Sequence, residues 1–253
     1  MQHAAFNRSA LIRLLSEAHP QIADPKYDFG ERLGRWLDLS DAMTLYSVLG
    51  TEAGERTSLR PSEHDLPDQL LRVRRALSDA IANDGVFNAA SEETQPRTPP
   101  RIPFPSAAPS ANDDSAPDFT PFHRYYLAHQ REMNAAITAL RANARNALAA
   151  CSGAGRQLAD LDSAFEKTLS AREHNLMANI PILLAKCFNQ RYAEHRAANA
   201  DAGDSASWNK PGSWLDAFCK DTKRVLLAEL DLRQKPVAGL IAALTKASGE
   251  TNA

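Results

Sequence analysis

Apolar residues recur every seven positions between residues 126 and 151, in two rows that share one side of a helix. Spacings of three and four residues are typical of a helix that packs along another helix, as in a coiled coil. The first row is Tyr126, Met133, Leu140 and Ala147, and the second is Gln130, Ile137, Ala144 and Cys151. The pattern predicts one long helix that begins after Pro121 and ends near the glycines at 153 and 155.

A second long apolar row follows these glycines and supplies a partner for the first. Its members are Leu158, Leu161, Phe165, Leu169, Leu176, Ile180, Leu183 and Cys187. Because the connection is short, we expect the two helices to form an antiparallel hairpin. Pro181 lies inside this row, lacks an N–H and clashes with the carbonyl of Met177. Since the apolar spacing continues beyond Pro181, we predict a kink there and not the end of the helix.

Shorter apolar segments predict helices on both sides of the hairpin. Three to four short helices fall within residues 1–88, where we expect a small N-terminal bundle. A further helix is predicted from near Ser213 to just before Pro236, and a short terminal helix after this proline. Together with the hairpin, these helices form a predicted long-helix bundle over residues 121–247. No segment alternates apolar and polar residues for long enough to predict a strand, so the predicted fold class is all-α.

Residues 89–121 differ from the rest of the chain in composition. They hold eight of the 15 prolines, separated mainly by Ser, Ala, Asn and Asp. Such a segment buries too little apolar surface to offset the entropy of ordering it, so residues 89–120 are predicted to be a disordered linker. The stretch Arg97–Pro103 superficially suits a domain that binds polyproline helices, but a simple spacer is the favoured interpretation.

Charge and cysteine usage favour a cytoplasmic protein. The formal net charge is −2, and residues 121–200 are locally positive, with 10 basic and 6 acidic side chains. Three widely spaced cysteines do not suit the paired disulfides of a secreted chain. The longest uncharged helical stretch, Asn175–Ala185, is much shorter than the ~20 residues of a membrane span. We therefore expect a cytoplasmic chain without a membrane span.

No familiar catalytic or metal-binding pattern occurs in the chain. The seven histidines include no pair at the His-x-x-x-His spacing, which would present two imidazoles to one metal ion. Cys151 and Cys187 fall on the apolar rows, where a thiol packs as a small hydrophobic group. The segment Ser152–Gly155 lacks the lysine of a phosphate-binding loop. The sequence therefore predicts no catalytic residue, no metal site and no cofactor.

Basic side chains flank the apolar rows of the first long helix. Arg124, Arg131, Arg141 and Arg145 lie within ~100° of arc on an ideal helix. Such a face could follow a nucleic-acid backbone, with the nearby tyrosines available for base stacking. Alternatively, these arginines are ordinary solvated residues or pair with acidic side chains of a neighbouring helix. They form the candidate interaction surface of the chain.

Several segments resemble an uncharacterised bacterial family, the domain of unknown function numbered 3348. The resemblance rests on Phe6–Leu15, Phe29–Leu37, Gln157–Asp162, Ile180–Pro181 and Leu227–Val237. It brings no catalytic residues to this chain. Because members of the family tend to be encoded near envelope proteins of a motor or peptidoglycan-binding type, the resemblance implies an accessory role beside an envelope-associated complex.

The sequence therefore favours a non-enzymatic helical adaptor or scaffold, an accessory component of a bacterial protein assembly. Its expected partner is a protein, which the sequence does not identify. The alternative is nucleic-acid binding through Arg124, Arg131, Arg141 and Arg145.

Overall fold

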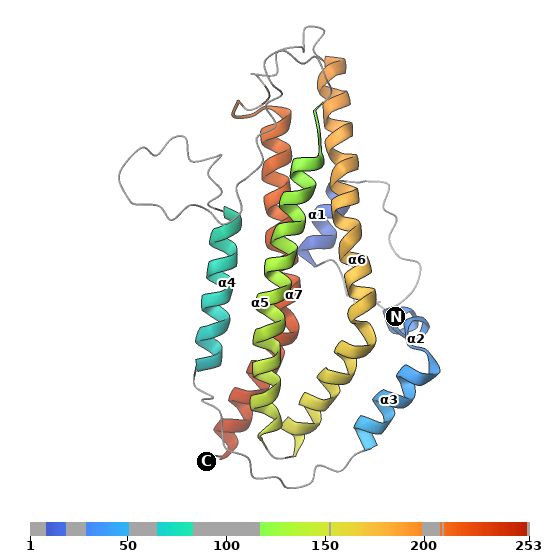
Figure 1. The fold of residues 1–253 in the computed structure, drawn as a ribbon, viewed down its shortest axis with the longest axis vertical. Helices are drawn as coiled ribbons and strands as arrows, with labels where there is room; N and C mark the ends of the chain where they lie inside the picture. Colours follow the sequence, from blue (N-terminus) through green and yellow to red (C-terminus); the bar gives the residue numbers. More distant parts are fainter. Residues whose placement is uncertain are drawn as a thin grey trace, which may run out of the picture.

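The fold consists of α-helices only. The computed structural model describes residues 9–18, 29–50, 65–82, 117–151, 153–198, 208 and 210–251 (Figure 1). These residues form seven helices and no strand, which confirms the predicted all-α class. The helices are α1 (Ala10–Ala18), α2 (Phe29–Trp36), α3 (Leu39–Gly50), α4 (Leu66–Ala82), α5 (Thr120–Ala149), α6 (Ala154–Ala198) and α7 (Trp214–Thr251).

The three longest helices, α5, α6 and α7, form the centre of the molecule. Each contacts the other two, and α5 lies directly in front of α7 in Figure 1. Pro121 stands in the first turn of α5, where the backbone N–H that proline lacks has no partner within the helix. The first predicted row of α5, from Tyr126 to Ala147, is buried as expected. In the second row, Ile137 and Ala144 are buried and Gln130 is half-buried.

The apolar row predicted for α6 is only partly correct. Leu158 and Leu176 are exposed, and the buried side chains near the start of α6 are the small Ala159 and Ala164. The turn from α5 into α6 explains the difference at Leu158. Gly153 adopts a positive φ of 62°, and a Cβ at Gly155 would lie 3.0 Å from the Cβ of Cys151. Because the two helices approach closely at this end, the small Ala159 is buried near the turn and Leu158 is exposed.

Pro236 does not end the last helix, contrary to the prediction. Helix α7 continues through Pro236 to Thr251, and the proline ring is exposed. A proline inside a helix costs about 3 kcal/mol. Beyond it, Val237, Leu240 and Leu244 are buried, and burial of each such side chain contributes roughly 1.5–3 kcal/mol. Packing of the final turns therefore outweighs the cost of the proline.

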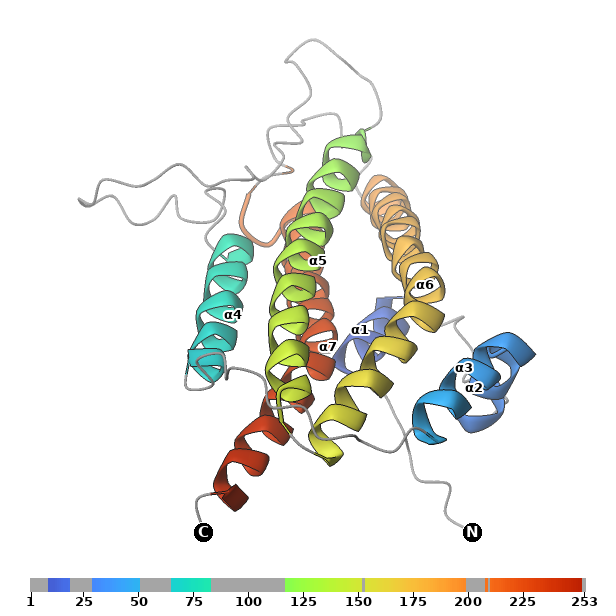
Figure 2. The same ribbon diagram turned by 60° about the horizontal axis from the view of Figure 1, so that its bottom comes forward.

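The short helices lie against the long ones. Helix α1 contacts α7, α4 contacts α5 and α7, and α3 contacts α6. Leu11 of α1 and Leu66, Leu77 and Ile81 of α4 join the same hydrophobic core as α5 and α7. Figures 1 and 2 show α3 and α4 on opposite sides of the three long helices. Helices α1, α3 and α4 thus each pack on at least one long helix.

Two predictions on the organisation of the chain fall outside these observations. The Pro-rich segment lies almost entirely outside the described residues, so its disorder stays a prediction. The division of the chain at residues 88 and 120 also stays a prediction. No helix in the described ranges is long and apolar enough to cross a membrane.

Substitution of Leu140 by Asp tests the central packing. Leu140 is buried in the core, and an unpaired carboxylate there should lower the free energy of unfolding by more than about 4 kcal/mol. Because α1 and α4 share this core, they and the three long helices should lose their helicity in one thermal transition, which circular dichroism can follow. Leu176→Asp is the matched control, since Leu176 is 52% exposed. Equal melting temperatures for the two variants would contradict the packing described here.

Candidate functional site

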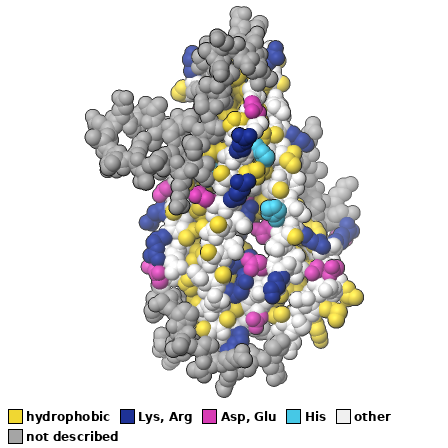
Figure 3. Space-filling view, viewed as in Figure 1, with side chains coloured by type: hydrophobic (Ala, Val, Ile, Leu, Met, Phe, Trp, Pro, Cys, Tyr) yellow, Lys and Arg dark blue, Asp and Glu magenta, His cyan; other side chains and the backbone are white. Residues whose placement is uncertain are grey.

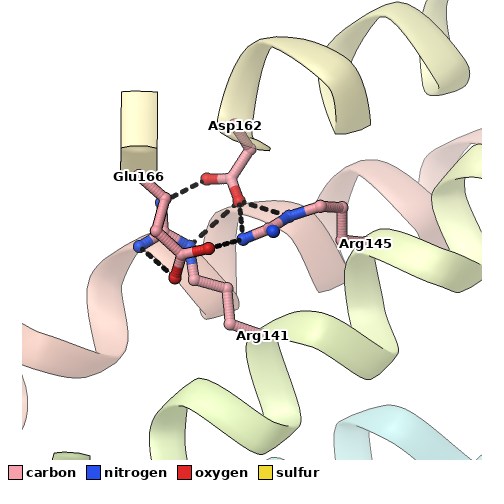
Figure 4. A network of polar contacts seen from close by, with 4 residues as sticks. All are labelled: Arg141, Arg145, Asp162 and Glu166. Atoms are coloured by element: carbon pink, nitrogen blue, oxygen red, sulfur yellow. Dashed lines mark hydrogen bonds and ion pairs between the residues drawn. The ribbon is translucent and has the colours of Figure 1, made fainter. Parts of the chain in front are cut away.

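Two of the four predicted surface arginines form ion pairs with the next helix. Arg141 donates to both carboxylate oxygens of Asp162, at 2.9 and 2.6 Å (Figure 4). Arg145 donates to Asp162 at 3.1 Å and to Glu166 at 2.6 Å. Two cations of α5 thus face two carboxylates of α6, and the cluster ties the helices together close to their connecting turn.

We call Arg141, Arg145, Asp162 and Glu166 the Arg141 cluster, and it removes two arginines from the expected basic face. The arginine side chains are only 15% and 18% exposed. Burial lowers the pKa of Arg141, but the hydrogen bonds and charge of Asp162, with the charge of Glu166, outweigh that effect and raise the pKa above its ordinary value. Arg141 and Arg145 therefore serve the contact between α5 and α6, whereas Arg124 and Arg131 are exposed.

The visible surface of the long helices carries no continuous basic stripe. On the face shown in Figure 3, Lys and Arg side chains are scattered among Asp, Glu and His side chains. A nucleic-acid backbone attracts extended positive potential, and interspersed carboxylates reduce that potential.

A buried carboxylate, Glu229 of α7, is the centre of a second polar cluster. Its side chain is fully buried, and the Tyr126 hydroxyl donates a hydrogen bond of 2.7 Å to it. Gln130 donates its Nε2 to the same carboxylate at 3.0 Å. Arg233, one turn further along α7, donates from Nε at 2.8 Å and forms the ion pair with Nη2 at 2.7 Å. The charge of Glu229 is thus balanced inside the protein.

Gln130 also connects this cluster to α6. Its Nε2 lies 3.2 Å from the carbonyl oxygen of Met177. This carbonyl is the one that Pro181 leaves without a helical partner, because proline has no N–H to donate. One amide of α5 therefore contacts both the carboxylate of α7 and the unpaired carbonyl of α6. We call Tyr126, Gln130, Glu229 and Arg233, with the Met177 carbonyl, the Glu229 network.

The Glu229 network is suited to holding helices and not to binding a substrate. Glu229 and Tyr126 are completely enclosed, so that neither group reaches solvent. Burial, the charge of Glu229 and the hydrogen bond to it raise the pKa of Tyr126 well above its ordinary value of 10.0. The phenol therefore stays protonated and donates to the carboxylate. Sequence reasoning missed Glu229, although a Glu and an Arg four residues apart within an apolar segment are a usable signal.

Within the described ranges, the other ionisable groups do not gather into a cluster suited to catalysis or metal binding. Among the described residues, no group of three His, Cys, Asp or Glu side chains could hold a metal ion. Burial raises the pKa of the Cys219 thiol to about 12, and burial also raises that of Cys187. Both thiols stay protonated near neutral pH, which does not suit a nucleophile.

One side of α3 exposes four large apolar side chains. Leu39 and Tyr46 are each 79% exposed, Met43 is 65% exposed and Leu49 is 55% exposed. Figure 3 shows hydrophobic side chains over α3, at the lower right of the molecule. We call Leu39, Met43, Tyr46 and Leu49 the α3 face. Scattered exposed leucines are ordinary, but a row of four on one short helix is typical of an interaction surface.

The two ends of α3 are held by local hydrogen bonds. Asp38 and Asp41 each accept the backbone N–H of the other, at 2.8 and 3.2 Å, and so cap the first turn. At the other end, Gln157 of α6 donates to the carbonyl of Leu49 at 3.2 Å. The α3 face is thus presented on a capped helix that is anchored to α6.

The family model described as "Protein of unknown function (DUF3348)" matches residues 1–246. The chain belongs to the DUF3348 family. The match covers α1 to α6 and most of α7, so the Glu229 network and the α3 face both lie inside the DUF3348 region. No curated protein and no solved structure matches the chain. For this member of DUF3348, function must therefore be inferred from the surfaces and clusters described above.

Substitution of Tyr126 by Phe in this DUF3348 chain tests the Glu229 network through pH. Because the pKa of Tyr126 is raised in the folded state, its contribution is complete below the unfolded pKa near 10 and decreases as pH rises above it. Tyr126→Phe should lower the free energy of unfolding at pH 7 by about 1.5–3 kcal/mol, the value of a hydrogen bond to a charged group. As pH rises above 10, the free energy of unfolding should also decrease less for Tyr126→Phe than for the wild type.

Urea unfolding between pH 7 and 11 measures both effects. Tyr46→Phe is the control, because the Tyr46 side chain is exposed and its change should stay within about 0.5 kcal/mol. Parallel pH profiles for the wild type and Tyr126→Phe would show that the phenol is not held protonated by Glu229.

Proposed function

We propose that this chain is a non-enzymatic helical adaptor or scaffold, an accessory component of a bacterial protein assembly in the cytoplasm. The α3 face is its docking surface. The observation that carries the proposal is the exposure of Leu39, Met43, Tyr46 and Leu49 on one side of a single helix.

Helix α3 has the apolar composition of a buried helix, but one side of it is exposed. Its 12 residues include one charged side chain, Asp41, and Leu45 and Val48 are half-buried in addition to the exposed row. Thr44 and Ser47 donate their hydroxyls to carbonyls of α3 itself, at 2.9 and 2.8 Å. A helix that is apolar on most sides is normally buried, so covering the α3 face with protein should be favourable.

The remaining polar clusters support a role in assembly and not in catalysis. The Glu229 network and the Arg141 cluster both connect long helices to one another, which gives a stiff support for α3 through α6. The envelope-associated complex implied by the family resemblance is the partner class that we propose for this support.

Two other uses of the surface have less support. Nucleic-acid binding through the four arginines would have to rely on Arg124 and Arg131, since the other two are paired with carboxylates. Helices that lie in a membrane surface usually carry many Lys and Arg residues on the polar side. Helix α3 has no basic residue.

Affinity capture with matched variants tests the proposal. The tagged full-length chain, Met43→Glu and Leu71→Glu are each expressed in the native cell, and captured complexes are measured by native mass spectrometry. Leu71 of α4 is the control, because it is 54% exposed and lies outside the α3 face. We expect a stoichiometric protein partner with the wild type and Leu71→Glu, and its loss with Met43→Glu.

Nuclease treatment before capture separates protein partners from nucleic acid. The complex should survive this treatment, and its recovery should change little with salt, because the α3 face has no charge to screen. Equal capture by Met43→Glu and the wild type would contradict docking on α3. Loss of the complex after nuclease treatment would contradict the adaptor itself.

A further inference from the structure

We infer that α1 is a removable plug. It occupies a site beside α7 that accepts the apolar side of a short helix, and it can leave this site while the rest of the protein stays folded. A partner helix with leucines at the same spacing can then take its place. The plug lies apart from the α3 face, so it does not depend on the proposed function.

The first observation is the narrow apolar side by which α1 is held. Leu11 is 3% exposed and belongs to the hydrophobic core, and Leu14 and Leu15 pack against that core. These leucines stand at positions i, i+3 and i+4, which share one side of a helix. Ile12 points away from this side and is 52% exposed. Three leucines therefore supply the contact of α1 with α7.

The second observation is that the polar contacts of α1 stay within α1. The Ser9 hydroxyl accepts the backbone N–H of Ile12 at 3.3 Å, and the Ser16 hydroxyl donates to the Ile12 carbonyl at 2.8 Å. Helix α4, by contrast, is tied to α7 by the ion pair between Arg74 and Asp231. In the described part of the chain, no hydrogen bond or ion pair joins α1 to another helix. Because apolar contacts are not directional, another apolar helix can replace this one.

The third observation is the length of α1, which has only 9 residues. Isolated helices shorter than ~12 residues are marginal in water, so α1 is helical because it is docked on α7. The burial of one leucine and the partial burial of two others oppose the entropy lost when the whole segment becomes ordered. The docked state of α1 is therefore favoured by a small free energy, and a free state is accessible within the folded protein.

The fourth observation concerns α6, on the other side of α1. Figures 1 and 2 show α1 between α6 and α7. The buried side chains of α6 form two groups, one at Ala159 and Ala164 and the other within Ile180–Phe188. No residue from 165 to 179, about four turns of the helix, is buried. This part of α6 therefore has no buried contact that must break when α1 leaves.

Binding of a separate α1 peptide tests the plug. A fluorescently labelled peptide of residues 7–20 is added to the full-length wild type and to Leu11→Glu, in which the new carboxylate should expel α1 from its apolar site. Fluorescence anisotropy should show at least about tenfold tighter binding to Leu11→Glu, because the wild-type site is already occupied by the α1 of the same chain. Ile12→Glu is the matched control and should behave like the wild type, since Ile12 is exposed.

Two further controls make the peptide experiment decisive. A peptide that itself carries Leu11→Glu should bind neither protein, because it lacks the leucine that the site buries. Circular dichroism should show that the long helices of the Leu11→Glu protein still melt cooperatively. Equal binding of the unchanged peptide to the wild type and Leu11→Glu, or no binding to Leu11→Glu, would overturn the inference. Loss of cooperative melting in Leu11→Glu would overturn it as well, because α1 would then be required by the fold.

Hydrogen exchange of the wild type in low concentrations of urea tests whether α1 leaves by itself. Amides of α1 should exchange at rates that depend little on urea, because release of one short helix exposes little surface. Amides of Leu226 and Leu230, which are buried in α7, should exchange with a strong dependence on urea, since they open only when the whole molecule unfolds. The same urea dependence for both helices would overturn the inference, because α1 would then leave only on global unfolding.

Discussion

The fold depends on the fully buried carboxylate of Glu229, which must not be left uncompensated. An unpaired charge in a protein interior costs several kcal/mol, so Glu229 requires its donors in place whenever the long helices are packed. Arg233 comes from the same helix, but Tyr126 and Gln130 come from α5. The relative rotation and height of α5 and α7 are therefore set by hydrogen-bond geometry as well as by apolar packing, which is less directional.

The same network contacts α6 at the point where a backbone hydrogen bond of α6 is missing. Pro181 removes one hydrogen bond from α6, and the carbonyl of Met177 accepts the amide of Gln130 in its place. Figure 1 shows that α6 changes direction along its length, and α3 lies beside the part that leads to the turn. Gln130 near the middle of α6 and the Arg141 cluster close to the turn both hold α6 against α5. The position of α3, which rests on α6, follows from both.

Sequence reasoning predicted the parts of this structure that depend on local spacing. The heptad rows identified the buried side of α5, and the spacing across Pro181 indicated that α6 continues. It was wrong at Pro236, because the favourable burial of Val237 and Leu240 outweighs the cost of a proline inside the helix. It was also wrong at Leu158, because the close approach of α5 and α6 at their turn favours alanine, and at Leu176, which lies far along α6 from this turn. Of the candidate surface, the pairing of Arg141 and Arg145 with acidic residues was one of the two alternatives considered. The exposure of α3 could not be predicted from the sequence, since its apolar spacing is equally compatible with a buried helix.

The double role of Gln130 has a consequence for the variation of this chain. A donor at position 130 is needed for two reasons: the charge of Glu229 and the missing N–H of Pro181. A glutamate at position 130 would set two carboxylates together, and a leucine would leave a carbonyl and a carboxylate each one donor short. Positions 130, 181 and 229, which are far apart in the sequence, are therefore physically coupled in the fold. Where a relative replaces the proline, the constraint on its glutamine should relax, and substitutions at these positions should be inherited together.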